Sequence, residues 1–209
     1  MARLTGRPAE LLSYEDVRRK LKIQGRKPPK LKEIPLNAIV GSVDRYTDFT
    51  RSFLPKDTAD AHRWAGVKVA VTDLKGLPPI EVYQIGDVYF VGDGNHRVSV
   101  ARELGQDSIQ AYVTELATKV PLRPDVDVDD LILKAEYVDF LEHAHLDQSR
   151  PEADLTLTVP GGYRVLEQHI AVHRYFLGLE QQREIPNEEA AAHWYDQVYM
   201  PVVRTIREQ

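Results

Sequence analysis

The residues with the clearest chemical potential form one short run, Asp93-Gly94-Asn95-His96-Arg97, between a β-rich segment and a helical pattern. Free N–H groups point outward at a helix start, and the helix dipole adds partial positive charge there. Gly94 lets the backbone come close to a ligand, and the guanidinium of Arg97 matches the geometry of phosphate oxygens. His96 offers a further hydrogen bond. The run therefore predicts an anion site, in which the phosphate contacts are Gly94, Asn95, His96 and Arg97.

A purely structural interpretation of the same run is equally compatible with the pattern. Asp93 or Asn95 then caps the helix, His96 packs against it, and Arg97 is a solvated charge. Ser99, one turn further along, either reaches a phosphate or is a small residue at a packed position.

Asp44-Arg45 is a second candidate pair, and it follows Gly41-Ser42-Val43 at the end of a predicted strand. Arg45 could bind a phosphate, with Arg51 as a weaker member of the same loop. The alternative is an ordinary solvated salt bridge within the loop.

The elements around the run are well marked. Two β-rich segments, 80–85 and 88–91, are separated by Gly86-Asp87, which is typical of a tight hairpin. The helix expected over 95–104 has apolar residues on one face and Gly105 as its C′ residue. A further strand is expected over 109–113.

The remaining elements are predicted with less local detail. They are a helix over 13–24 capped by Ser13, a strand over 31–40, a short helix within 41–65, a weak strand over 67–71, an alternating run over 155–159, and helices over 129–145, 163–181 and 187–207, the last kinked or split by Pro201. Together they predict an α+β fold with a small mixed sheet and a C-terminal helical extension. We expect three parts: a helix and basic linker over 1–30, the sheet domain over 31–119, and the extension over 120–209.

Composition limits the function classes. The chain has 209 residues, a net charge of −5 and no cysteine, which excludes disulfides, thiolate metal sites and cysteine nucleophiles. No apolar run approaches the length of a membrane span, and the N-terminus has no apolar signal region, so we expect a cytoplasmic protein. Any contact with DNA must come from a local basic patch, the segment 18–32. Aromatic residues of the last helices predict either core packing or a homodimer surface.

Residues 78–105, PPIEVYQIGDVYFVGDGNHRVSVARELG, resemble the signature of the ParB/sulfiredoxin superfamily. Its members share a proline-led strand, a hairpin, a glycine-containing turn ending in His-Arg or Arg-Arg, and a helix ending near Leu-Gly. The resemblance extends over about 31–116 and implies a phosphate-binding domain of that type.

Three branches of the superfamily differ at this turn. Sulfiredoxins have a catalytic cysteine where this chain has Asn95, which excludes sulfinic-acid reduction. Partition proteins have a turn like Gly-Glu-Arg-Arg that binds a cytidine nucleotide. Free-serine kinases have Asp-Gly-His-His-Arg, which differs from this chain at one position.

Three functions follow from the resemblance. The first is a nucleotide- or phosphate-binding protein, with ATP, ADP or CTP and Mg²⁺, and a kinase-like activity in which Asp93 or Asp44 is the catalytic carboxylate. The second is a DNA-associated transcriptional or partition regulator gated by nucleotide. The third, a nuclease, lacks the clustered carboxylates that two-metal cleavage needs.

Two weaker patterns resemble metal sites. The acidic run 125–130 fits part of a calcium-loop template, but position 6 is Asp130 instead of glycine, so an acidic helix cap is the preferred interpretation. His169 and His173 would share a helix face without a third ligand, and a packing or surface role is favoured. We predict no protein-bound metal centre.

Overall fold

The computed structural model describes residues 10–54, 56 and 78–208. The chain divides into two compact units, Met1–Leu131 and Ile132–Gln209. The predicted strand over 67–71 and most of the short helix predicted within 41–65 lie outside the described residues.

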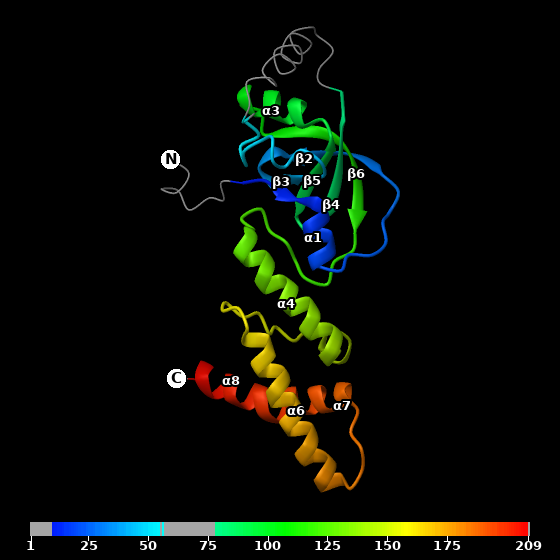
Figure 1. Cartoon of the computed structure of the whole chain (residues 1–209), viewed down its shortest axis with the longest axis vertical. Coiled ribbons are helices and arrows are strands. Elements are labelled where there is room, and N and C mark those ends of the chain that lie inside the picture. The colour runs from blue at the N-terminus through cyan, green and yellow to red at the C-terminus, as the bar shows by residue number, and fades with distance from the viewer. Residues whose placement is uncertain (1–9, 55, 57–77, 209) are drawn as a thin grey trace. The chain divides into compact units, whose positions relative to one another are not determined.

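The first unit is built on a six-stranded mixed sheet with the order β1-β3-β5-β4-β6-β2 (Figure 1). Strands β4 and β5 form an antiparallel hairpin, while β3 pairs with β5 and β4 pairs with β6 in parallel. The sheet with its helices confirms the predicted α+β fold. The strands are β1 Leu12–Ser13, β2 Lys30–Pro35, β3 Ile39–Ser42, β4 Ile80–Ile85, β5 Val88–Asp93 and β6 Ser108–Leu116.

The hairpin of β4 and β5 forms where the sequence predicts it. Ile85 pairs with Val88 across the turn, and Gly86 has a φ of +60°, a conformation that glycine adopts readily. Strand β5 ends at Asp93, and helix α3, Asn95–Glu103, begins after the single residue Gly94. That helix ends as expected, with Gly105 at a φ of +69°.

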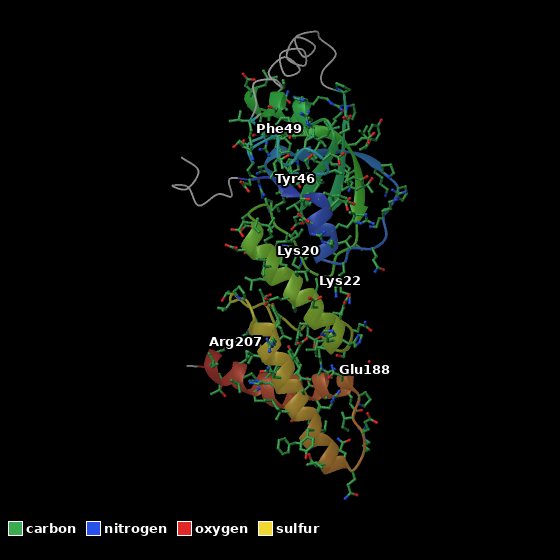
Figure 2. All side chains as sticks on the ribbon, viewed as in Figure 1. Lys20, Lys22, Tyr46, Phe49, Glu188 and Arg207 are labelled. Carbon is green, nitrogen blue, oxygen red and sulfur yellow. The ribbon has the colours of Figure 1, made fainter. Side chains whose placement is uncertain are left out.

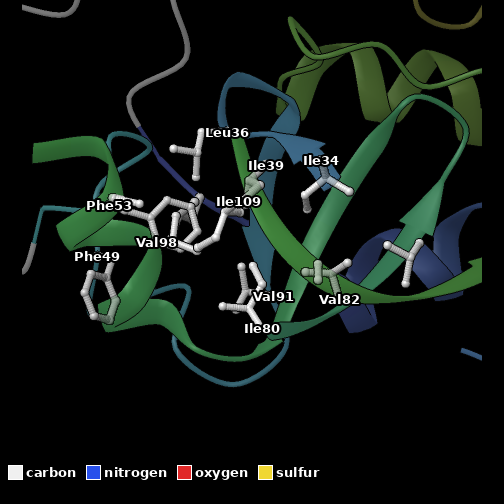
Figure 3. Packing of buried hydrophobic residues seen from close by; sticks show 14 residues of the cluster. Ile34, Leu36, Ile39, Phe49, Phe53, Ile80, Val82, Val91, Val98 and Ile109 are labelled. Atoms are coloured by element: carbon white, nitrogen blue, oxygen red, sulfur yellow. The ribbon is translucent and has the colours of Figure 1, made fainter. Parts of the chain in front are cut away.

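Helix α3 is fixed by its apolar face. Val98 and Ala101 are fully buried and belong to one cluster with residues of the sheet and of the loop after β3. Figure 3 shows the labelled side chains of this cluster gathered beside the sheet. Burial of this face sets the direction in which the first turn of α3 points. The cluster contains Leu11, Ile34, Leu36, Ile39, Phe49, Phe53, Ile80, Val82, Val91, Val98, Ala101, Ile109, Ala111 and Val113.

The N-terminal segment joins this sheet. Ser13 caps helix α1, Tyr14–Lys20, by accepting from the N–H of Asp16 at 3.3 Å, as predicted, but the helix ends four residues earlier than expected. Strand β1 pairs with β3 in parallel. The strand expected over 31–40 is interrupted by the 3-10 turn Leu36–Ala38 and forms two strands. One of them, β2, is an edge strand of the sheet, and the other, β3, lies next to the opposite edge.

The second unit is helical. Helix α4, Val128–Ala144, begins in the first unit, and α5, Leu146–Ser149, α6, Gly162–Gln181, and α7, Asn187–Trp194, follow. Tyr163 stacks on Tyr137 at 5.1 Å between ring centroids. The alternating run 155–159 forms no strand, although Leu155 is buried at 1% exposure.

The last predicted helix is divided before Pro201. A π-helical turn, Tyr195–Tyr199, separates α7 from α8, Met200–Arg207. Proline cannot donate the hydrogen bond that a continuous α-helix requires at this place. No described helix has the length and apolar character needed to cross a membrane.

Candidate phosphate-binding site at the start of helix α3

The turn between β5 and α3 depends on Gly94. Its φ is +107°, and a Cβ atom there would lie 2.5 Å from Cγ2 of Ile80 and 3.1 Å from Cζ of Arg97. No other residue type fits this position without moving the side chains of Ile80 and Arg97. Gly92, in contrast, lies in β5 with no positive φ, so the glycine requirement of this turn applies to Gly94.

The first turn of α3 has no side-chain cap among the described residues. Gly94 is the N-cap, and neither Asp93 nor Asn95 caps the helix as the structural interpretation expected. The N–H of Val98 is the first to bond within the helix, to the Gly94 carbonyl at 3.0 Å. The N–H groups of Asn95, His96 and Arg97 therefore precede the helical ladder, where the helix dipole favours an anion.

Arg45 and His96 meet beside this turn. Nη1 of Arg45 donates to Nε2 of His96 at 2.9 Å, across 51 residues of sequence. A guanidinium has donors only, so Nε2 acts as the acceptor and the imidazole is in a neutral form. The structure thus joins the two segments that the sequence marked as separate candidates.

Asp48 and Phe49 hold this pair, and sequence reasoning missed both. Nε of Arg45 donates to Oδ2 of Asp48 at 2.7 Å, and this hydrogen bond lowers the pKa of the Asp48 carboxyl. The ring of Phe49 (labelled in Figure 2) meets His96 edge-on at 5.3 Å and lies 5.4 Å under the Arg45 guanidinium. The i, i+3 spacing of Arg45 and Asp48 was the available signal for the first contact.

The loop that carries Arg45 is tied down by Arg102. Its guanidinium donates to the carbonyls of Arg51 and Leu36, both at 2.6 Å, and of Ile39 at 3.1 Å. It also lies 5.0 Å from the ring centre of Phe53. Burial lowers the pKa of Arg102 to about 10.

Arg51 has a structural place in the same loop. It donates to the carbonyls of Pro124 at 3.0 Å and Val126 at 3.1 Å, and burial together with Arg102 lowers its pKa to about 10. The structure therefore does not bring Arg51 to the start of α3 with Arg45.

Arg97 braces the turn from the other side. Its Nη1 donates to the carbonyls of Pro79 at 2.7 Å and Pro78 at 3.1 Å, and its Nη2 pairs with the Asp93 carboxylate. The Arg97 side chain is 18% exposed and that of Asp93 is 71% exposed. The guanidinium fork that the sequence assigned to phosphate therefore holds the entry to β4 in place.

The remaining predicted residues differ in accessibility. Asn95 is 7% exposed, and its Oδ1 has no hydrogen-bond partner among the described residues. Ser99 is 2% exposed on the packed side of α3, whereas Asp44 is exposed on the loop after β3. The turn and the Arg45–His96 pair thus form the centre of the candidate site.

The weaker sequence patterns have structural explanations. Asp127 and Asp130 exchange side-chain-to-backbone hydrogen bonds of 2.9 and 3.3 Å at the start of α4, in agreement with the helix-cap interpretation. His173 contacts His193, with Nε2 and Nδ1 2.8 Å apart. Over the described ranges, no three His, Cys, Asp or Glu residues are grouped to hold a metal ion.

The basic segment predicted to contact DNA is partly neutralised. Lys27 and Lys32 both donate to the carboxylate of Glu115, at 2.8 and 2.5 Å. DNA binding through the other cations of 18–32 stays a prediction.

Comparison with known proteins gives structural neighbours only. No protein-family model matches the chain, and no curated protein does. A sulfiredoxin from Arabidopsis thaliana aligns at 19% identity over 41% of this chain and 84% of that protein, with a TM-score of 0.31. ParB from Caulobacter crescentus, complexed with CTP-gamma-S, aligns at 14% identity over 78% and 71%, also at 0.31. A Pnob8-like ParB-N domain aligns at 12% identity over 89% and 87%, at 0.29. These are the two groups that residues 78–105 resemble; at such TM-scores the likeness carries no argument about function, which must come from the site itself.

Proposed function

We propose that the first unit binds a nucleotide through its phosphates at the start of helix α3. The observation that carries the proposal is the Arg45–His96 pair, held at 2.9 Å beside a helix N-terminus without a side-chain cap among the described residues. Backbone amides, a helix dipole and a positioned guanidinium together favour a multiply charged anion.

Each group has a distinct part in binding. The N–H groups of Asn95, His96 and Arg97 donate to phosphate oxygens, and Gly94 keeps side-chain atoms away from them. A phosphate oxygen is a charged acceptor and attracts the Arg45 guanidinium more strongly than a neutral imidazole does. Asp48 and Phe49 keep Arg45 close to this position.

Magnesium would fit the site only as an ion bound together with the nucleotide phosphates. The described residues contain no group of three carboxylates or histidines, and Mg²⁺ is commonly bound by phosphates, water and one or two carboxylates. Asp44, exposed on the loop that carries Arg45, is the residue that would contribute such a carboxylate.

The geometry supports binding better than phosphoryl transfer. A catalytic carboxylate must accept a proton from the attacking hydroxyl, but the Asp93 carboxylate is already paired with the Arg97 guanidinium. We therefore propose a nucleotide-binding domain without a kinase-like reaction.

Calorimetric titration tests the proposal. CTP, ATP and ADP, each with and without Mg²⁺, are titrated into the wild-type chain and into Arg45→Ala. Loss of a charge-assisted hydrogen bond in Arg45→Ala should lower the affinity for the nucleotide roughly tenfold or more. Arg19→Ala, which removes an exposed arginine paired with Asp16, is the matched control and should bind as the wild type does. Absence of binding for all three nucleotides, or equal affinity of Arg45→Ala, would contradict the proposal.

A further inference from the structure

The imidazole of His96 lies in the site next to the guanidinium of Arg45. Nη1 of Arg45 donates to Nε2 of His96 at 2.9 Å. The lone pair of Nε2 is therefore used by Arg45, and no proton can occupy this nitrogen while the contact lasts. Protonation of His96 and the position of Arg45 thus depend on each other.

The charged side chains around this contact form ion pairs. Nε of Arg45 lies 2.7 Å from the Asp48 carboxylate, and the Arg97 guanidinium is paired with Asp93. In each pair the two formal charges cancel. A terminal phosphate group carries about two negative charges at neutral pH, whereas the helix dipole offers roughly half a positive charge. Binding of a nucleotide therefore creates a demand for one more positive charge in the site.

We propose, on the basis of the nucleotide site described above, that His96 takes up a proton from solvent when the nucleotide binds. A phosphate oxygen draws the donor of Arg45 to itself, and the lone pair of Nε2 becomes available beside a charged acceptor. A negative charge within about 4–6 Å favours the protonated imidazole. The proton adds to Nε2, which then donates a hydrogen bond to a phosphate oxygen, and no covalent bond to the nucleotide forms.

The groups that face the imidazole allow this additional charge. The hydrogen bond from Arg45 lowers the pKa of the Asp48 carboxyl most, and the charge of His96 adds a smaller contribution in the same direction. The interaction is mutual, so the Asp48 carboxylate favours a protonated His96. Arg45 opposes the proton, but less so once its donor has turned to the phosphate. On the side of α3, Arg97 and Asp93 balance each other.

Proton uptake makes the affinity depend on pH with a defined sign. The bound state holds more protons at His96 than the free state, so a lower pH favours binding. We expect the affinity for ATP or CTP to rise roughly twofold or more from about pH 8 to pH 7, with tenfold as the limit for one proton. Over this range the terminal phosphate stays largely doubly charged, because its second ionisation lies near pH 6.

Calorimetric titration in two buffers of different ionisation enthalpy counts the protons. ATP and CTP are titrated into the full chain at about pH 7 in Tris and in HEPES. Magnesium is left out, because Mg²⁺ on the phosphates would supply positive charge of its own. The dependence of the observed enthalpy on the buffer should correspond to uptake of about half a proton or more per bound nucleotide.

Two variants assign the proton to its residue. His96→Gln retains an acceptor for Arg45 but cannot be protonated, so its proton uptake should be close to zero. His169→Gln, at an exposed histidine of the second unit, is the matched control and should take up protons as the wild type does. Proton uptake that is equal in His96→Gln and the wild type would overturn the proposal.

Nitrogen NMR of the wild-type histidine rings tests the same step without a substitution. On saturation with nucleotide at about pH 7, the Nε2 signal of His96 should move from the position of an unprotonated nitrogen to that of a protonated one. Binding that leaves this signal unchanged would contradict proton uptake and leave the nucleotide site standing. Absence of nucleotide binding would contradict both proposals.

Discussion

Arg97 shows how a residue with the chemistry of a ligand contact can serve the framework of the site. It donates to two proline carbonyls and pairs with Asp93, so its planar fork connects the start of β4 with the first turn of α3. A lysine retains the charge but cannot reach three acceptors in different directions.

We expect Arg97→Lys to lower the free energy of unfolding by roughly 1–2 kcal/mol, because hydrogen bonds from a charged group are lost. Urea denaturation measures this effect. Arg19→Lys, at an arginine whose side chain is 76% exposed, should change stability by much less. Equal stability of Arg97→Lys and the wild type would show that the brace is unimportant.

Arg102 holds the loop that carries Arg45 through hydrogen bonds to backbone carbonyls, as Arg97 holds the turn before α3. Arg102→Leu leaves the carbonyls of Arg51, Leu36 and Ile39 without their donor, at a cost of about 2–4 kcal/mol in unfolding free energy. Hydrogen exchange should also become faster over residues 45–54. Normal exchange there in a destabilised protein would mean that Arg102 stabilises the sheet without holding the loop.

At the scale of elements, the sequence best predicted the turns and helix ends whose conformation depends on residues adjacent in the chain. The hairpin of β4 and β5, the start of α3 after Gly94 and its end at Gly105 all follow from turn chemistry within a few positions. The position of β1 beside β3 does not, because a two-residue strand has no periodicity of its own. The 3-10 turn Leu36–Ala38, which divides the predicted strand over 31–40, depends on where the next strand finds a partner.

In the candidate site, too, the part formed by adjacent residues was predictable and the part formed by distant residues was not. The turn around Gly94 was predictable, because strand, glycine and helix follow one another in the chain. The contact of Arg45 with His96 joins residues 51 positions apart, and the edge-on contact of Phe49 depends on how the intervening loop packs. Nothing in the local sequence of either segment identifies the other as its partner.

The pairing of β2 with β6 has an electrostatic clamp at one end. Lys27 and Lys32 both donate to Glu115, and these hydrogen bonds lower the pKa of its carboxyl to about 2. Because the folded value lies below the ordinary 4.5, the carboxylate stabilises the fold above pH 4.5 and this contribution is lost as the pH falls toward about 2. A carbon-detected NMR titration should give the low pKa for Glu115, and Lys27→Ala with Lys32→Ala should raise it. A midpoint near 4.5 in the wild type would show that the clamp is not formed in solution.

At the scale of the whole molecule, the two units should respond differently to acid. In the second unit, burial and the neighbouring His193 lower the pKa of His173 below its ordinary 6.5, while Glu180 acts in the opposite sense. His193 also lowers the pKa of the neighbouring Asp196 and Glu189 carboxyls, as a smaller contribution after their hydrogen bonds with arginines. The folded second unit thus takes up a proton at His173 less readily than the unfolded chain.

Stability of the second unit should therefore fall as the pH drops below about 6.5. Urea unfolding of a Trp64→Phe chain, followed by the fluorescence of buried Trp194 at pH 7.5 and about 5.5, measures this. His173→Gln should reduce the pH dependence, and His169→Gln, at an exposed histidine one turn earlier, should retain it. An unchanged pH dependence in His173→Gln would assign the effect to other groups.

The central claim is that the first turn of α3 receives the phosphates of a nucleotide, and amide NMR observes that turn directly. On titration of ¹⁵N-labelled chain with CTP or ATP, the N–H signals of Asn95, His96 and Arg97 should shift progressively and saturate, together with the Nε–H signal of Arg45. Nucleosides without phosphates should leave these signals in place. If the nucleotides shift other regions and leave these three amides unmoved, the site proposed here is not where the anion binds.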